Sequence, residues 1–313
     1  MEDRSNLGIV RGIAPKGPLP KTPVELLGLK EELTLALCQV GSELGQKEKN
    51  LEKAIFHVEQ AAGEGADLVA FPETYLVNYM AQPESRYLAE PVPGPSTLAL
   101  AEAARAYNIY IVLGMPTCVK EFPGLVRNSA AVIGPREGVM GVYSKLSLPT
   151  CCMGEILFTE GNYWTPGTSL PIFDIRGWKV AINICYDCWI PETPRVQTLM
   201  GAQLLLTISA GPDSTAEGWE HVLKTRAIEN RVYQAYCNVV GSFREVSFFG
   251  GNRVIGPGGK EVVNGPLGEE ALVIGTIHAH SLYDARCQMP GLRPGLDVPS
   301  YLYHRLSQVV ESQ

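Results

Sequence analysis

The chain has 313 residues, of which 45% are hydrophobic and 19% are charged, and its formal net charge is −7. This composition is typical of a globular protein with a full hydrophobic core, in one large domain or two small ones. The negative charge argues against a nucleic-acid or anionic-membrane surface. No uninterrupted apolar run reaches the roughly 18–20 residues of a membrane span. We therefore expect neither nucleic acid nor a membrane as a partner.

Cysteine usage and the N-terminal composition indicate the compartment and the domain limits. The eight cysteines are scattered along the chain, and the first residues contain no long apolar segment of the secretory type. We interpret the cysteines as reduced thiols of a cytoplasmic protein, not as a disulfide framework. Four prolines fall between positions 15 and 23. They predict an extended leader over residues 1–31, followed by one folded domain over residues 32–313.

The first part of this domain alternates strands with helices. Leucines alternate with smaller residues from Leu33 to Leu37 and predict a strand that ends near Gln39 and Val40. Apolar residues at helical spacing predict a helix over 47–62, which ends at Gly63 and Gly65. Further expected elements are a strand at 67–71, a helix at 97–107, and strands at 109–113, 128–133 and 139–145.

The second part contains more strands than helices. After a loop that runs to about Pro166, we expect strands at 172–175, 180–184, 203–209, 234–240, 253–255 and 271–277, with helices from Pro191 and over 218–232. The tail from Leu292 onward is predicted to be polar and irregular. The order of elements indicates an α/β protein with one mixed sheet, or with two sheets, covered by helices.

Cys185 stands where the buried strand at 180–184 ends. Open α/β sheets bind their ligands at the carboxyl ends of strands. The helix expected from Pro191 would bring a positive helix end close by, which favours a thiolate. A cysteine in such a place is more often a small buried hydrophobe than a nucleophile. Cys185 alone therefore does not establish a catalytic site.

Two other predicted strands end in charged side chains. Glu73 follows the strand at 67–71, and Lys145 closes the strand at 139–145. Taken singly, Glu73 could be a carboxylate held by backbone amides, and Lys145 could be a surface lysine at a turn. Together with Cys185 they form a coherent set, because a carboxylate can remove a thiol proton and an ammonium can stabilise an oxyanion. We hypothesise that Cys185 is a nucleophile.

Three motifs resemble the nitrilase superfamily of carbon–nitrogen hydrolases. They are Pro72-Glu73-Thr74 after an apolar strand, YSKLSLP at 143–149 and ICYDCWIPE at 184–192. Support continues in KTRAIENRVYQAYCNVVG, FFGGNRVIGPGG and RPGLDVPSYLY, so that the resemblance runs from Leu33 to Tyr303. It implies a single-domain αββα sandwich of two mixed sheets flanked by helices. It also implies a homodimer or higher homo-oligomer that needs no cofactor and no metal.

The resemblance further implies residue roles. Glu73 matches the general base, Lys145 the lysine and Cys185 the nucleophile of the family. The backbone N–H of Tyr186 would help Lys145 to hold the oxyanion. Where the family commonly has a histidine after the lysine, this chain has Ser147.

A second glutamate often follows the lysine in this family. Glu160 fits this position best, because it precedes the aromatic-Thr-Pro-Gly run from Trp164 to Gly167, as the glutamate of the family does. The loop that separates it from Lys145 is longer than usual. Glu155 is therefore the nearest competitor.

The residues after the cysteine bear on the substrate. Tyr186-Asp187 is the amidase-like form, whereas nitrilases proper usually have Trp-Glu there. Cys188 and Trp189 stand where branches that hydrolyse N-carbamoyl amino acids place arginines, and neither can bind a carboxylate. The resemblance thus favours a small-molecule primary amide, cleaved to acid and ammonia through a thioester. An N-carbamoyl amine is the alternative, because Cys-aromatic-Asp-x-Trp also resembles the N-carbamoylputrescine branch.

Four aromatic residues are candidates for apolar walls of a substrate pocket: Tyr79, Trp164 and Trp189, with Tyr75 as a further one. Aromatic residues of this kind are more often ordinary core. We treat the four positions as hypotheses about substrate binding.

Functions from other classes of protein remain as alternatives. Cys185 and Cys188 could bind zinc together with Cys151 and Cys152, although two spaced CxxC pairs are the usual pattern. A papain-like dyad would need a histidine, for which His221 is the one plausible candidate. A non-catalytic interaction domain on the same fold need not keep Glu73, Lys145 and Cys185 together. Arg226 and Glu229 are interpreted as a structural ion pair, and Asn252 as a structural residue.

Overall fold

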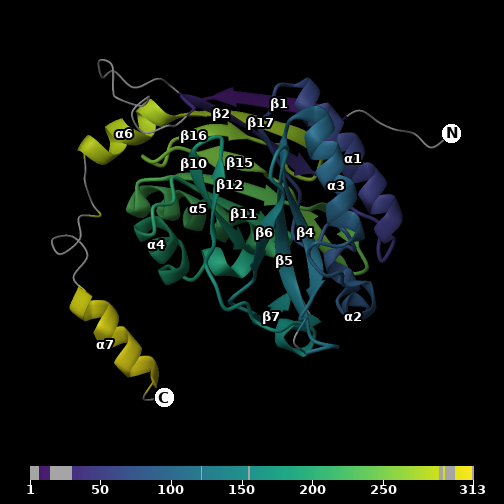
Figure 1. The fold of residues 1–313 in the computed structure, drawn as a ribbon. Helices are drawn as coiled ribbons and strands as arrows, with labels where there is room; N and C mark the ends of the chain where they lie inside the picture. Colours follow the sequence, from purple (N-terminus) through teal and green to yellow (C-terminus); the bar gives the residue numbers. More distant parts are fainter. Residues whose placement is uncertain are drawn as a thin grey trace.

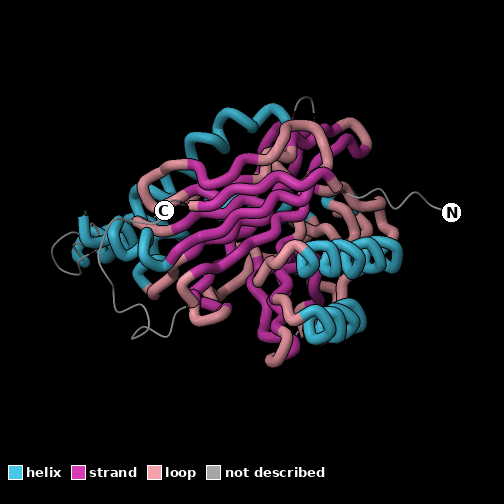
Figure 2. Tube along the Cα trace, turned by 90° about the horizontal axis from the view of Figure 1, so that it is seen from above, coloured by secondary structure: helices cyan, strands magenta, loops and turns pink. Residues whose placement is uncertain are grey.

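The computed structural model describes residues 7–14, 30–120, 122–153, 156–288, 292 and 300–311. Two large sheets face each other, and helices cover their outer faces (Figure 1; Figure 2). The seven-stranded sheet has the order β1-β17-β2-β3-β4-β5-β6, and the six-stranded sheet has the order β16-β15-β12-β11-β10-β9. The predicted αββα sandwich of two mixed sheets is confirmed.

The seven-stranded sheet is built mainly from the first half of the chain. Its strands are β1 (Gly8–Ile13), β2 (Glu32–Gln39), β3 (Leu68–Ala70), β4 (Tyr110–Cys118), β5 (Val126–Gly134), β6 (Gly138–Ser144) and β17 (Ala271–His278). Strands β2, β3 and β4 are parallel, whereas β5 runs antiparallel to both β4 and β6. The helices α1 (Lys47–Gly63) and α3 (Pro95–Tyr107) lie against its outer face (Figure 1). The short helices η2 (Tyr79–Ala81) and α2 (Ser85–Leu88) follow β3.

The six-stranded sheet comes from the second half. Its strands are β9 (Ile172–Ile175), β10 (Trp178–Ile184), β11 (Leu204–Ser209), β12 (Tyr233–Asn238), β15 (Arg253–Ile255) and β16 (Glu261–Asn264). Strands β10, β11 and β12 are parallel. The helices α4 (Glu192–Leu199), η5 (Asp213–Thr215), α5 (Ala216–Asn230) and α6 (Ala279–Gln288) complete this half.

The main core lies between the two sheets, and the sequence pattern explains why. Leu33, Leu35 and Leu37 of β2 all enter the cluster that joins both sheets. The alternate residues Ala36 and Cys38 face the other way and pack with α1 and α3. Because side chains alternate across a strand, the small residues allow the helices to approach closely while the leucines fill the centre.

Several elements differ from the sequence predictions. Gly8–Ile13 of the predicted leader forms β1, which pairs in parallel with β17, so this part belongs to the domain's own sheet. The rest of the leader, 1–6 and 15–29, lies outside the described residues. The long loop before Pro166 contains the hairpin β7 (Thr150–Met153) and β8 (Ile156–Thr159). A second unpredicted hairpin joins β13 (Val240–Phe243) to β14 (Val246–Phe249).

The tail prediction was wrong for its last part. Residues Ser300–Glu311 form the helix α7, whose side chains are all at least partly exposed. Leu302, Leu306 and Val309 recur at helical spacing after the last proline, which is the periodicity that the tail prediction missed. In the part of the chain that the structure describes, no helix is both long and apolar enough to cross a membrane.

Candidate active site

The candidate catalytic residues stand at the carboxyl ends of strands from both sheets. Glu73 follows β3, Lys145 follows β6, and Cys185 follows β10 and begins the short helix η4 (Cys185–Cys188). Glu160 begins the helix η3 (Glu160–Asn162) after β8. The strand ends of the two sheets meet here, since the Glu73 N–H donates to the carbonyl of Ser209 at the end of β11, at 3.4 Å.

Lys145 is the centre of this group. Its Nζ donates to Glu73 Oε1 at 2.8 Å and to Glu160 Oε1 at 2.7 Å, and all three side chains are fully buried. Burial alone would lower the pKa of the Lys145 ammonium, but Glu160 and Glu73 outweigh it and hold the pKa well above its ordinary value. An ammonium has three donors. Two are used here, so one remains for a bound molecule.

Glu73 is fixed by partners from three further segments. Asn128 Nδ2 donates to Oε1 at 2.7 Å, and the Ala210 backbone N–H donates to Oε2 at 2.9 Å. Gly114 of β4 lies so close that a Cβ there would collide with the Pro72 carbonyl oxygen. A carboxylate has about four acceptor positions. Lys145, Asn128 and Ala210 fill three of them, which leaves one for proton transfer.

Glu160 completes the cluster from the opposite side of Lys145. The Tyr79 hydroxyl donates to its Oε1 at 2.7 Å, and its Oε2 has no hydrogen-bond partner among the described residues. Burial raises the pKa of Glu160 to about 7, with Glu73 adding to the rise while Lys145 and Tyr79 oppose it. The structure therefore brings Glu160 to the lysine. Its competitor Glu155 lies outside the described residues.

Cys185 differs from the acid–base cluster in two ways. It is partly exposed, and its backbone φ of +49° lies in the left-handed region that non-glycine residues rarely adopt. Burial of the sulfur raises the pKa of the Cys185 thiol well above its ordinary value, and Glu73 adds to this effect although Lys145 opposes it. The expectation that a helix end favours the thiolate was therefore wrong, since burial and the nearby carboxylate outweigh that effect. The thiol holds its proton at neutral pH and needs a base to remove it.

Three of the four candidate pocket aromatics lie in two clusters near the candidate catalytic residues. The rings of Tyr79 and Trp164 lie 5.8 Å apart beside Glu160, in one cluster with Phe158. Trp189 packs against Trp219 at 5.4 Å in a different cluster, which Cys185 also contacts. Substrate contact at these positions stays a prediction.

Tyr75 is placed differently from these residues. It lies with Phe71 in the cluster beneath α1 and α3, on the outer face of the seven-stranded sheet. It is therefore core, which is the more frequent role of such an aromatic residue, and not a pocket wall.

The structure does not support the alternative zinc site or the alternative Cys–His dyad. Cys188 is fully buried against Trp219, and burial raises the pKa of its thiol to about 12, which disfavours the thiolate that zinc requires. Within the described residues, no three His, Cys, Asp or Glu side chains gather as a metal site. His221 is exposed on α5. The predicted structural ion pair is confirmed, because Arg226 Nη1 lies 2.8 Å from Glu229 Oε1.

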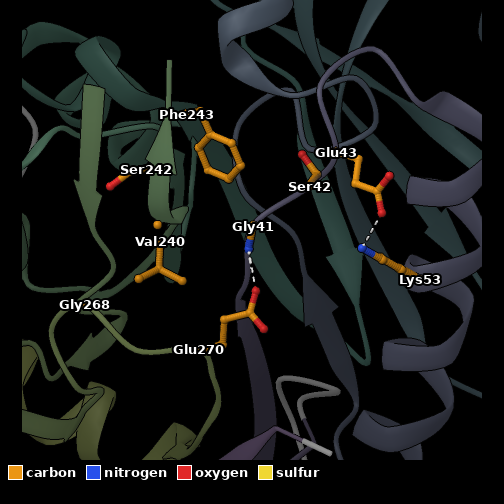
Figure 3. Close-up of a pocket in the computed structure, with 10 residues that line it drawn as sticks. Gly41, Ser42, Glu43, Lys53, Val240, Ser242, Phe243, Gly268 and Glu270 are labelled. Carbon is orange, nitrogen blue, oxygen red and sulfur yellow. Dashed lines mark hydrogen bonds and ion pairs between the residues drawn. The ribbon is translucent and has the colours of Figure 1, made fainter. Parts of the chain in front are cut away.

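A surface cavity of about 340 Å³ lies elsewhere, between the end of β2 and the β13–β14 hairpin (Figure 3). Its lining does not include the candidate catalytic residues. Its charged groups already have partners within the chain: Glu43 pairs with Lys53 at 2.9 Å, and Glu270 accepts the Gly41 N–H at 3.1 Å (Figure 3). We do not assign this cavity to the active site.

The sequence predicted Glu73, Lys145 and Cys185 but missed the groups that hold them. Asn128 appeared only as the start of a strand, and Ala210 acts through its backbone. Asparagine in a strand that continues as the apolar residues 130–133 was the one signal that could have pointed to this support, because a buried amide needs hydrogen-bond partners. Asn252 is structural as predicted, since its Oδ1 accepts the Asn238 N–H at 2.6 Å.

Comparisons with known proteins agree with this arrangement. The family model described as carbon–nitrogen hydrolase matches residues 34–286. The human omega-amidase NIT2 is 32% identical over 250 residues, which cover 79% of this chain and 89% of that protein. The zebrafish (Danio rerio) omega-amidase NIT2 is 34% identical over 248 residues, covering 78% of this chain and 88% of that protein.

Solved structures show the same fold. A carbon–nitrogen hydrolase from Helicobacter pylori G27 superposes with a TM-score of 0.79 at 23% identity, covering 88% of this chain and 98% of that one. Nit3 from Saccharomyces cerevisiae, a member of branch 10 of the nitrilase superfamily, superposes with a TM-score of 0.76 at 22% identity, covering 86% and 98%. The segment that the family model matches includes every strand end described above. The chain therefore belongs to the carbon–nitrogen hydrolase family of the nitrilase superfamily.

Proposed function

We propose that the chain is a cysteine-dependent amidase that converts a small primary amide into its acid and ammonia through a thioester on Cys185. One observation carries the proposal: Lys145 Nζ bridges Glu73 and Glu160 at the strand ends where Cys185, a partly exposed residue, also lies. The similarity to omega-amidases supports an amide as substrate.

The first half of the reaction is acyl transfer to sulfur. Glu73 uses its remaining acceptor position to take the Cys185 proton, and the thiolate attacks the amide carbon. The carbonyl oxygen becomes an oxyanion. The proton on Glu73 then passes to the leaving nitrogen, the C–N bond breaks, and ammonia departs.

The oxyanion needs donors that are already in place. Lys145 has one unused N–H, and the backbone N–H of Tyr186 follows directly after the nucleophile. A donor that is fixed before the reaction stabilises the developing charge without reorganisation, and one such donor is typically worth about 10²–10³ in rate.

The second half of the reaction is hydrolysis. Glu73, again ionised, removes a proton from water, and the hydroxide attacks the thioester carbon. The C–S bond breaks, the acid leaves, and the sulfur recovers its proton from Glu73. The pKa of about 7 at Glu160 means that this second carboxyl exchanges its proton near neutral pH, beside the lysine that holds the oxyanion.

The experiment measures ammonia release near neutral pH from a panel of primary amides, N-carbamoyl amines, N-carbamoyl acids and nitriles. Cys185→Ala serves as the blank. Cys38→Ala is the matched control, because Cys38 is a buried thiol on the far face of the seven-stranded sheet. We expect release from primary amides that Cys185→Ala abolishes and Cys38→Ala keeps. Release from N-carbamoyl amines alone would contradict the amide assignment, and release that persists in Cys185→Ala would contradict the mechanism.

A homodimer, or a larger homo-oligomer, is part of the same proposal. Light scattering on the purified chain tests it, and a monomer at micromolar concentration would contradict it.

A further inference from the structure

Asp187 is a fully buried carboxyl group in η4, and the mechanism above gives it no role. Its Oδ1 accepts the backbone N–H groups of Leu146 at 3.1 Å and Ser147 at 2.8 Å. Its Oδ2 accepts the Tyr143 hydroxyl at 2.6 Å and the Ile184 N–H at 3.1 Å. All four groups donate to Asp187, which matches an ionised carboxylate, and three of them are backbone N–H groups that cannot accept a hydrogen bond in return.

These four contacts join the two sheets at the residues beside the reacting groups. Tyr143 lies two residues before Lys145, and Leu146 and Ser147 follow it directly. Ile184 is the residue before Cys185. The carboxylate of Asp187 therefore connects the chain on both sides of the lysine to the turn that carries the thiol.

We propose that Asp187 is a positioning residue that fixes the distance and orientation between the Lys145 ammonium and the Cys185 thiol. This inference rests on the proposed function, since it concerns the geometry of the same reaction. Cys185 needs such support, because its φ of +49° is strained, and a strained residue persists only where its surroundings hold it. A displacement of about 1 Å at a reacting group can lower the rate about 10²-fold.

The principal test is Asp187→Asn, which keeps the shape of the side chain. Either orientation of the amide points an NH₂ group at one or two backbone N–H groups, which cannot accept a hydrogen bond, so the link between the segments is weakened. Rates are expressed per reactive Cys185, counted by stoichiometric iodoacetamide labelling and peptide mass spectrometry. We expect kcat for the best amide to fall about 10²-fold while KM changes less than about threefold. A kcat per reactive thiol within about threefold of the wild type would overturn the proposal, even if the variant melts earlier.

Tyr143→Phe carries the test if Asp187→Asn does not fold. It removes one of the four donors and leaves the charge of Asp187 in place. We expect kcat per reactive thiol to fall about fivefold. Tyr233→Phe is the matched control, because Tyr233 of β12 is also fully buried and donates its hydroxyl to the carbonyl of His278 at 3.2 Å. The control should keep its kcat per reactive thiol, and equal losses in the two variants would contradict a positioning role.

A second readout does not depend on any substrate. Lys145 favours the thiolate, so a looser lysine in Tyr143→Phe should slow the alkylation of Cys185 by iodoacetamide near neutral pH about threefold, with no change in Tyr233→Phe. If the wild type hydrolyses no amide, the proposed function fails, and the alkylation rates still decide the role of Asp187. Unchanged alkylation in Tyr143→Phe would overturn that role.

Discussion

The two sheets contribute to the candidate site in opposite ways. The seven-stranded sheet supplies Glu73 and Lys145, which lie fully buried in a network of short hydrogen bonds with Glu160. The six-stranded sheet supplies Cys185, which is partly exposed and has a strained backbone. Glu73 and Lys145 thus belong to a buried network of charges that contributes to stability. Cys185 lies outside this network, and in the proposed reaction it is the residue that meets the substrate. Changes at Cys185 should therefore lower activity alone, whereas changes at Lys145 should lower both activity and stability.

The thiol side should affect activity alone. We expect Cys185→Ala to lower turnover by about 10⁴-fold or more, since the nucleophile has no substitute. The thermal midpoint should stay nearly unchanged, because only one sulfur atom is removed, it makes no ion pair, and the alanine adopts the same strained φ. Ammonia assays and calorimetry measure the two effects. A large loss of stability would mean that the thiol has a packing role, and it would contradict the claim that Cys185 contributes to activity alone.

The lysine side should affect both properties. Lys145→Met leaves two buried carboxylates without their cation, so we expect a loss of roughly 3–5 kcal/mol in the free energy of unfolding and about 10²–10³ in rate. Chemical denaturation measures the first, and kcat/KM the second. Lys179→Met is the matched control, because its ion pair with Asp174 at 2.8 Å is half-exposed and should be worth less than about 1 kcal/mol. Equal stability losses in the two variants would refute the account of the cluster.

A substitution at Gly114, whose backbone lies against the turn of Pro72 and Glu73, should have a smaller effect on stability. Gly114→Ala would drive a Cβ into the Pro72 carbonyl oxygen, so β4 and the Glu73 turn must move apart. We expect a loss of about 1–3 kcal/mol in stability, as for other overpacked sites, together with a lower kcat. Gly63→Ala is the control, because a Cβ added there, at the end of α1, would meet no neighbouring atom within 4 Å. If Gly114→Ala keeps full activity, the position of Glu73 does not depend on this close approach.

The last effect is a pH dependence of stability that belongs to Glu160. Its pKa of about 7 in the folded chain exceeds the ordinary value of 4.5, so the folded state binds a proton that the unfolded state releases between these values. Stability should therefore fall as pH rises from about 4.5 to about 7, by roughly 3 kcal/mol from this group. Urea unfolding at several pH values should show that Glu160→Gln removes this slope. A wild type and variant with parallel curves would contradict the raised pKa.

Much of the fold and of the candidate site could be predicted from the sequence. The alternating leucines of β2 and the apolar run of β10 identified strands, and Glu73, Lys145 and Cys185 stood where three such strands end. Periodicity could not reveal β1, whose place was decided by pairing with β17, far along the chain. It could not reveal Asn128 or Asp187 as supports either, because their partners are distant in the sequence: Asn128 reaches Glu73 within the seven-stranded sheet, and Asp187 reaches Tyr143 across the two sheets. The raised pKa of Cys185 likewise depends on burial and on Glu73, which outweigh any local helix end.

The measurement that tests the central claim most directly is mass spectrometry of the acid-quenched enzyme during turnover of its best primary amide. The account predicts an added mass equal to the acyl group, located on the peptide that contains Cys185 and absent from Cys185→Ala. Turnover in the wild type with the acyl group on another residue, or ammonia release that survives in Cys185→Ala, would contradict it.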